Sequence, residues 1–115
     1  TDIKVADSNG EWYRETGRGM GATLNMASSM DAYTLSDRST WLSFGNKGNL
    51  ALLFQGDPPM FNQYGIILVN PKKHPHARAE EGQVFIDWML GEVGQNLINS
   101  FQIQGQQAFF ANAAR

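Results

Sequence analysis

The spacing of apolar residues predicts two helices in this chain. One stripe recurs every three or four residues, at Met20, Leu24, Ala27 and Met30. A second stripe has the same spacing, at Ile86, Leu90, Val93 and Leu97. Such spacing places the apolar side chains on one face of a helix. Gly91 and Gly94 interrupt the second stripe, so we expect a kink there or a division into two helices.

Three other stretches are typical of strands. Residues 32–35 end in a polar turn, and residues 49–55 and 64–70 are mostly apolar runs between turn-forming residues. Residues 40–44 predict a short helix, so helices and strands alternate, which favours an α/β fold. Strands that are apolar on both faces belong inside a sheet, and three strands make a narrow one. We therefore expect this chain to be part of a larger α/β unit.

Composition excludes several classes of function. The net charge of -2 gives no basic surface for nucleic acid or for an anionic membrane. No apolar run reaches about 18 residues, so no insertion into a membrane is expected. The chain has no cysteine, which excludes thiol catalysis, disulfides and thiolate metal ligands. Residues 1–10 have neither a basic nor an apolar leader pattern, so an export signal would lie outside this sequence.

The string GRGMGA, residues 17–22, opens the first predicted helix. It fits a dinucleotide-binding fingerprint, but that motif follows a buried strand, and residues 11–16 have no strand pattern. A second interpretation relies on the free amides of a helix start, at Gly19, Met20 and Gly21, where glycine lets an anion come close. The pattern fits equally a glycine turn whose amides bond to water, and the alternatives stay open.

A second set of hydrogen-bond donors follows the first predicted strand. Ser36 carries a hydroxyl and Arg38 a forked guanidinium, and both suit a tetrahedral oxyanion. Ligands of open α/β sheets bind beyond the carboxyl ends of strands, where these residues stand. In the competing interpretation Ser36 or Asp37 caps the next helix, and Arg38 points into solvent.

No pattern in the chain points to catalysis or to a metal centre. His74 and His76 flank a proline in a polar connector, and two histidines are too few ligands for a metal site. No serine sits in the glycine elbow that acyl transfer by a Ser-His-Asp triad requires. We therefore expect a protein that is not an enzyme, with no catalytic residue, no metal and no cofactor.

Longer strings of the chain are similar to one protein family. These strings are WYRETGRGMGATLNMASSMDAYTLSDRSTWL, GDPPMFNQYGIILVNPKKHPH, FIDWML and GQNLI. In this order, over residues 12–110, they resemble the second half of the tungstate-binding proteins of ABC importers. Members of that family have glycine in place of Ser39, and Ser-Pro-Glu-Gly-Gln where residues 91–95 read GEVGQ.

The resemblance implies a periplasmic-binding-protein-like fold, in which two α/β lobes hold an oxyanion between them and of which this chain is the C-terminal part. Residues 1–58 would belong to the second lobe and carry its oxyanion-facing helix and strand. Residues 59–115 would form the crossover and the C-terminal segment that returns to the first lobe. The implied partners are an ABC transporter permease and the missing N-terminal part of the same protein, or a second copy. The implied location is periplasmic or extracellular.

The resemblance also favours the anion interpretation of both donor sets. The ligand-binding residues it implies are Gly19, Met20, Gly21, Ser36 and Arg38. Tungstate and molybdate are proton-free dianions that only accept hydrogen bonds, whereas phosphate keeps a proton that a carboxylate accepts. We therefore expect the ligand to be tungstate or molybdate, with Asp37 turned away as a helix cap. The alternatives are a binding protein for another oxyanion, such as sulfate or phosphate, and a nucleotide-binding enzyme that uses residues 17–22.

Overall fold

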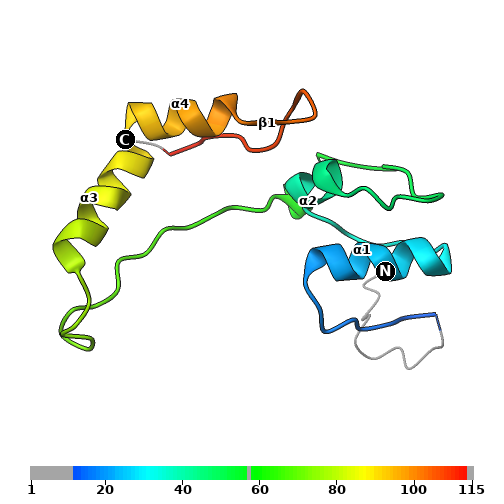
Figure 1. Cartoon of the computed structure of the whole chain (residues 1–115), viewed down its shortest axis with the longest axis horizontal. Coiled ribbons are helices and arrows are strands. Elements are labelled where there is room, and N and C mark those ends of the chain that lie inside the picture. Colours follow the sequence, from blue (N-terminus) through cyan, green and yellow to red (C-terminus); the bar gives the residue numbers. More distant parts are fainter. Residues whose placement is uncertain (1–11, 57, 114–115) are drawn as a thin grey trace.

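A computed structural model describes residues 12–56 and 58–113 of the chain (Figure 1). The predictions made for residues 1–10 lie outside this described part. Its elements are, in order, α1 (Met20–Met30), α2 (Arg38–Ser43), the 3₁₀ helix η2 (Pro58–Met60), α3 (Ala79–Leu90), α4 (Glu92–Ser100), β1 (Gln102–Ile103) and β2 (Gln106–Gln107).

The helix predicted from the first apolar stripe is confirmed as α1. Leu24 and Ala27, in the middle of the stripe, are buried. Ser28, one residue further on, donates a hydrogen bond from its hydroxyl to the backbone oxygen of Lys47 at 3.3 Å, so the loop after α2 lies against this helix. The helix ends at Asp31, which adopts a left-handed conformation (φ 49°) and donates its N–H to the carbonyl of Ala27.

The short helix predicted over residues 40–44 is present as α2 and begins two residues earlier. Asp37 sets this start, because its side chain accepts a hydrogen bond from the backbone N–H of Thr40 at 2.9 Å. Leu42 is the buried residue of α2. The helix therefore combines a polar cap with a single apolar anchor.

The expected break in the second long helical pattern is confirmed at Gly91. This residue ends α3 and also precedes α4, with an extended backbone (φ -75°, ψ 168°). Gly94 is buried against the end of α3, and a Cβ built on it would come too close to the carbonyl oxygens of Trp88 and Met89. Glycine at this position therefore lets the two helices meet at close range.

The three strands predicted from sequence do not form within the described chain. Residues 32–35, 49–55 and 64–70 have no strand ladder, and several of their apolar side chains are open to solvent. Leu53 is 72% exposed and Ile67 is 89% exposed. The prediction of buried strands was wrong for this chain taken by itself, because a strand needs neighbours to bond to and none are supplied here. Residues 61–70 instead run as a long open segment (Figure 1).

The only sheet in the described residues is a hairpin that the sequence did not predict. β1 and β2 pair antiparallel, with Gln102 opposite Gln107. Gln104 and Gly105 form the turn with positive φ angles of 52° and 76°. Two central residues with positive φ match the strand twist in a tight hairpin. The chain then reaches Ala108, which is buried.

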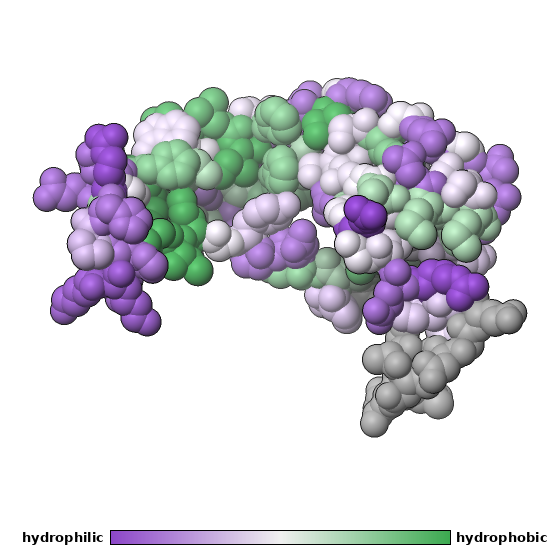
Figure 2. Space-filling model, turned by 60° about the horizontal axis from the view of Figure 1, so that its bottom comes forward, coloured by the Kyte–Doolittle hydropathy of each residue, from purple (hydrophilic) through white to green (hydrophobic). Residues whose placement is uncertain are grey.

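The chain is open in shape and has a small core. Its radius of gyration is 18.6 Å, whereas about 13 Å is usual for a compact domain of this length. It exposes 9520 Å², compared with about 6300 Å² for a compact monomer of this mass. The buried apolar residues are Leu24, Ala27, Leu42 and Ala108. Many other hydrophobic residues lie at the surface (Figure 2).

Two organisational predictions concern the chain as a whole. The proposed division between residues 1–58 and 59–115 falls at η2, and it stays a prediction. Among the described residues, no helix is both long and apolar enough to cross a membrane.

Candidate functional site

The start of α1 leaves its first turn open. Gly19 precedes the helix with an extended backbone, and no side chain caps it. The carbonyl of Gly19 accepts hydrogen bonds from the N–H and the hydroxyl of Thr23, at 3.1 and 3.2 Å. A Cβ built on Gly19 or Gly21 would meet no described atom within 4 Å. The amides of the first turn, from Met20 onward, therefore lack a side-chain partner, and Gly19 and Gly21 leave open space where side chains would stand.

The turn between α1 and α2 has its polar groups engaged locally. The Ser36 hydroxyl donates to the backbone oxygen of Asp37 at 3.0 Å. The Asp37 carboxylate accepts from the Ser39 hydroxyl at 2.7 Å and from the Thr40 N–H. Asp37 is thus the cap that the sequence predicted, and its carboxylate faces the first turn of its own helix.

These contacts change the acidity of Asp37. Partial burial by itself would raise the pKa of the carboxyl group. Hydrogen bonds from Ser39 and Thr40 favour the charged form and outweigh burial, so the pKa lies below the usual value for aspartate. The carboxylate therefore keeps its charge and its donors well into the acidic range.

Arg38 points to two later parts of the chain. Its Nε donates to the backbone oxygen of Gln107 at 2.8 Å, and its Nη1 donates to Oε1 of Gln55 at 3.2 Å. The guanidinium therefore links the start of α2 to the C-terminal hairpin and to the apolar segment before η2. It is not the free, solvated side chain of the competing interpretation.

The two predicted donor sets belong to successive helices and are not bonded to each other in the described chain. In the view of Figure 1 the chain that leaves α1 turns back, so α2 begins toward the N-terminal end of α1. A ligand that used both sets would have to lie between the start of α1 and the start of α2. Their joint use by one anion stays a prediction.

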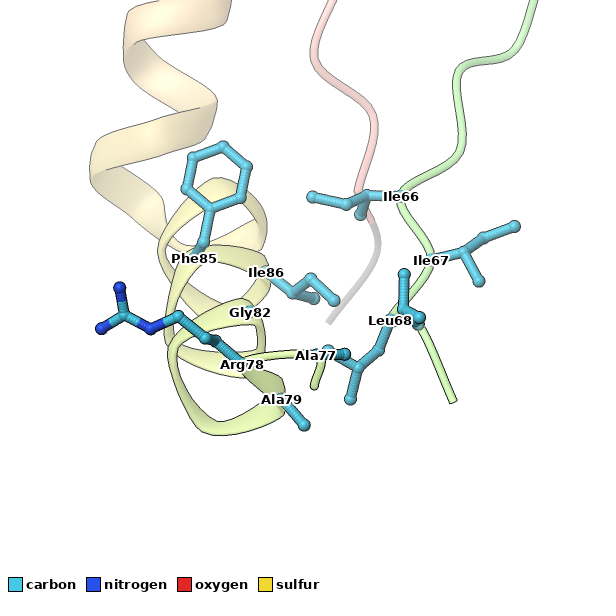
Figure 3. A pocket seen from close by; sticks show the side chains of 10 residues that line it. Ile66, Ile67, Leu68, Ala77, Arg78, Ala79, Gly82, Phe85 and Ile86 are labelled. Atoms are coloured by element: carbon cyan, nitrogen blue, oxygen red, sulfur yellow. The ribbon is translucent and has the colours of Figure 1, made fainter. Parts of the chain in front are cut away.

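A separate hollow lies away from these donors, between residues 66–69 and the start of α3 (Figure 3). Its volume is about 330 Å³, and its lining is mainly aliphatic and aromatic. Arg78 at its rim is paired with Glu81 at 2.5 Å. This hollow has the chemistry of a packing surface and lacks the converging donors that an oxyanion needs.

The histidines of the polar connector lie close to each other, with ring centres 6.0 Å apart. The carbonyl of Asn70 accepts from the N–H groups of Lys73 and His74 and closes the turn before them. Within residues 12–56 and 58–113, no three His, Asp or Glu side chains are grouped in a way that could hold a metal ion.

Comparison with known proteins gives the family. Residues 1–93 match the model of the PBP superfamily domain. The chain belongs to this superfamily. Membership agrees with the predicted periplasmic-binding-protein-like class.

Several curated proteins are similar to this PBP-type chain. Tungstate-binding protein TupA of Peptoclostridium acidaminophilum is 42% identical over 108 residues, which are 92% of this chain and 38% of that protein. A putative ABC transporter anion-binding protein of Haloferax volcanii is 38% identical over 112 residues, 93% of this chain and 33% of its own length. The chain thus spans about a third of the length of these relatives.

A solved structure is also similar. It is the crystal structure of a conserved, functionally unknown protein from Vibrio parahaemolyticus, 52% identical to this chain. The match covers 81% of this chain and 40% of that one, with a TM-score of 0.47.

Sequence reasoning missed the residues that hold Arg38. Gln55 closes an apolar run, and Gln107 lies in a glutamine-rich stretch, so neither stands out by residue type. The contacts join positions 17 and 69 residues apart along the chain. No local spacing rule covers such separations, so only the folded chain reveals this PBP domain's Arg38 contacts.

Proposed function

We propose that this chain is part of the extracytoplasmic solute-binding component of an ABC importer, and that it binds tungstate or molybdate. The observation that carries the proposal is the start of α1, which has no side-chain cap and open space at Gly19 and Gly21. Such a helix end offers N–H donors and partial positive charge to an oxyanion. The Peptoclostridium acidaminophilum relative is named a tungstate-binding protein, which supports the ligand class.

The proposed site consists of groups that donate hydrogen bonds. They are the first-turn amides at Gly19, Met20 and Gly21, the Ser36 hydroxyl and the Arg38 guanidinium. The hydroxyl of Ser36 rotates freely enough to leave its present acceptor for an anion. The carboxylate of Asp37, between Ser36 and Arg38 in the sequence, accepts from Ser39 and Thr40 through Oδ2 and so faces its own helix. A site built from donors, with this carboxylate turned toward its helix, favours a dianion that carries no proton over phosphate, which does.

Two alternatives differ in their support. A different oxyanion, such as sulfate or phosphate, fits the same helix start, and the Haloferax volcanii relative is named only for an anion. A nucleotide-binding enzyme would need a buried strand before residues 17–22. Residues 11–16 have no strand pattern in their sequence, so the context of that fingerprint is lacking. The comparisons name binding proteins, and we propose no catalytic step.

The partners follow from the exposed surface. Segments 49–55 and 64–70 carry unpaired backbone groups and bare apolar side chains, which fit inner strands of a wider sheet. We propose that the missing N-terminal part of the same protein supplies the neighbouring strands, with a second copy of the chain as the alternative. The second partner is the membrane permease, which would recognise lobes closed on their ligand. This role implies a periplasmic or extracellular location.

Titration of the full gene product with four oxyanions tests the proposal. Trp41 lies in α2, close after the proposed donors, and reports binding through its fluorescence. We expect a saturable change with tungstate or molybdate and little change with sulfate or phosphate. A response to phosphate alone supports the alternative oxyanion, and saturable binding of a nicotinamide nucleotide supports the enzyme.

A further inference from the structure

Arg38 is held at two of its nitrogen atoms by the protein itself. The Nε–H donates to the carbonyl of Gln107 at 2.8 Å, and Nη1 donates to Oε1 of Gln55 at 3.2 Å. A guanidinium has five N–H groups and accepts no hydrogen bond. Two are engaged here, and the remaining three, including both on Nη2, have no acceptor in the described chain.

The two acceptors restrict Arg38 in different ways. The Gln107 carbonyl belongs to the hairpin backbone and is fixed by strand pairing. Gln107 is fixed further through its side chain, whose Nε2 donates to the carbonyl of Phe109 at 2.9 Å. One bond at Nε still lets the guanidinium plane turn, and the second bond, from Nη1 to Gln55, restricts that rotation. The Gln55 contact therefore favours one direction for Nη2.

The amide orientation of Gln55 follows from this chemistry. Because arginine only donates, the oxygen of the Gln55 amide must face Nη1. Gln55 lies directly before Gly56, at the end of the apolar run that leads into the crossover. The bond thus joins the predicted anion-binding turn to the segment that links the two predicted parts of the chain.

We propose that Gln55 is a positioning residue of the oxyanion site, which holds the Arg38 guanidinium so that its free N–H groups are presented to the bound dianion. This inference rests on the proposed function and adds a residue to its site. A held guanidinium loses less conformational entropy on binding than a free one. The Gln55 side chain acts on the anion only through Arg38.

The experiment is a double-mutant cycle on tungstate affinity, measured by calorimetry with the full gene product. Gln55→Met removes the acceptor and keeps a similar side-chain length. We expect it to weaken binding about two- to tenfold, the cost of ordering one long side chain on binding. In an Arg38→Ala background we expect the same change to have almost no further effect, because Gln55 acts through Arg38.

A matched control separates positioning from general damage. Gln63→Met also removes a glutamine amide from the crossover, where it pairs with Asn112 at 2.7 and 3.2 Å and has no bond to Arg38. We expect this control to bind tungstate like the wild type. The melting temperature of unliganded Gln55→Met should stay close to that of the wild type, because a positioning role affects affinity more than stability.

The outcomes distinguish the inference from the function on which it rests. If the wild type binds tungstate but Gln55→Met weakens binding no more than Gln63→Met, or if the Gln55 and Arg38 effects add, the inference is overturned and the proposed function stands. If Arg38→Ala leaves the tungstate affinity unchanged, both Arg38 and Gln55 are excluded from the proposed site. If the wild type binds none of the four oxyanions, the inference and the proposed function fall together.

Discussion

The carboxylate of Asp37 accepts a hydrogen bond from the backbone N–H of Thr40 at 2.9 Å, and this contact begins α2. It engages Oδ2 of the carboxylate that stands between Ser36 and Arg38 in the sequence. The contact stabilises the helix, and it turns this carboxylate toward its own helix.

Replacing Asp37 tests the cap and its dependence on pH. Asp37→Asn should lower stability near neutral pH by about 1 kcal/mol or less, and Asp37→Ala by about 1 kcal/mol. Because the folded pKa of Asp37 lies below the unfolded value of about 3.9, its charge contributes stability above that value. The contribution is lost as pH falls through the folded pKa. The melting temperatures of wild type and Asp37→Asn, measured from pH 7 to pH 2, should therefore converge at the acidic end. A difference in melting temperature that stays constant with pH would contradict the lowered pKa.

Adding a methyl group at Gly21 distinguishes an effect on helix stability from an effect on access of the anion. Gly21→Ala favours the helix by up to about 1 kcal/mol and fills the space that is open above this position. We expect a melting temperature equal to or above that of the wild type, and a tungstate affinity lower by about tenfold through a lost amide contact. Ser29→Ala, at the far end of α1, is the control and should leave affinity unchanged. Undiminished binding by Gly21→Ala would contradict a close approach of the anion to residue 21.

The close meeting of α3 and α4 predicts a large effect at Gly94. A Cβ there would crowd backbone atoms of Trp88 and Met89, which cannot move aside as a flexible side chain does. Gly94→Ala should therefore destabilise the protein by about 1–3 kcal/mol. Gly45→Ala is the matched control, because a Cβ at Gly45 would meet nothing within 4 Å. Chemical denaturation compares the two, and equal stabilities would show that the helices meet less closely than described.

The exposed segment 64–70 predicts how the whole protein is assembled. Ile67 points away from α3 and is 89% exposed in this chain (Figure 3). If a neighbouring strand and layer cover it in the full gene product, Ile67→Asp should cost at least about 2 kcal/mol, from lost burial and a buried charge. Ile67→Val keeps an apolar side chain and should cost less. A fully stable Ile67→Asp protein would mean that this face stays in solvent.

The sequence predicted the helices better than the sheet, and the reason is physical. An apolar stripe such as the one through Leu24 and Ala27 depends on spacing within a single element, which a sequence displays. Strand pairing of residues 64–70 depends on partner strands elsewhere. A run of apolar residues indicates that such strands are needed but does not supply them. The hairpin turn at Gln104 and Gly105 was missed because glycine is a sequence signal for a positive φ and glutamine is not.

The candidate site was predictable in part. Glycines at a helix start and a capping aspartate are local features, and both Gly19 and Asp37 occupy the predicted backbone positions. The contacts of Arg38 with Gln55 and Gln107 were not predictable, because they join segments far apart in sequence. Local patterns identify donors in this chain, and only the fold shows which of those donors are held in place.

Isothermal titration calorimetry of the full gene product with tungstate tests the central claim most directly, with phosphate and sulfate as competitors. The proposed function predicts one saturable site for tungstate that a large excess of phosphate does not displace and that weakens in Gly21→Ala. No heat of binding with tungstate or molybdate, or displacement by phosphate at equal concentration, would contradict the assignment of a donor-only oxyanion site at the start of α1.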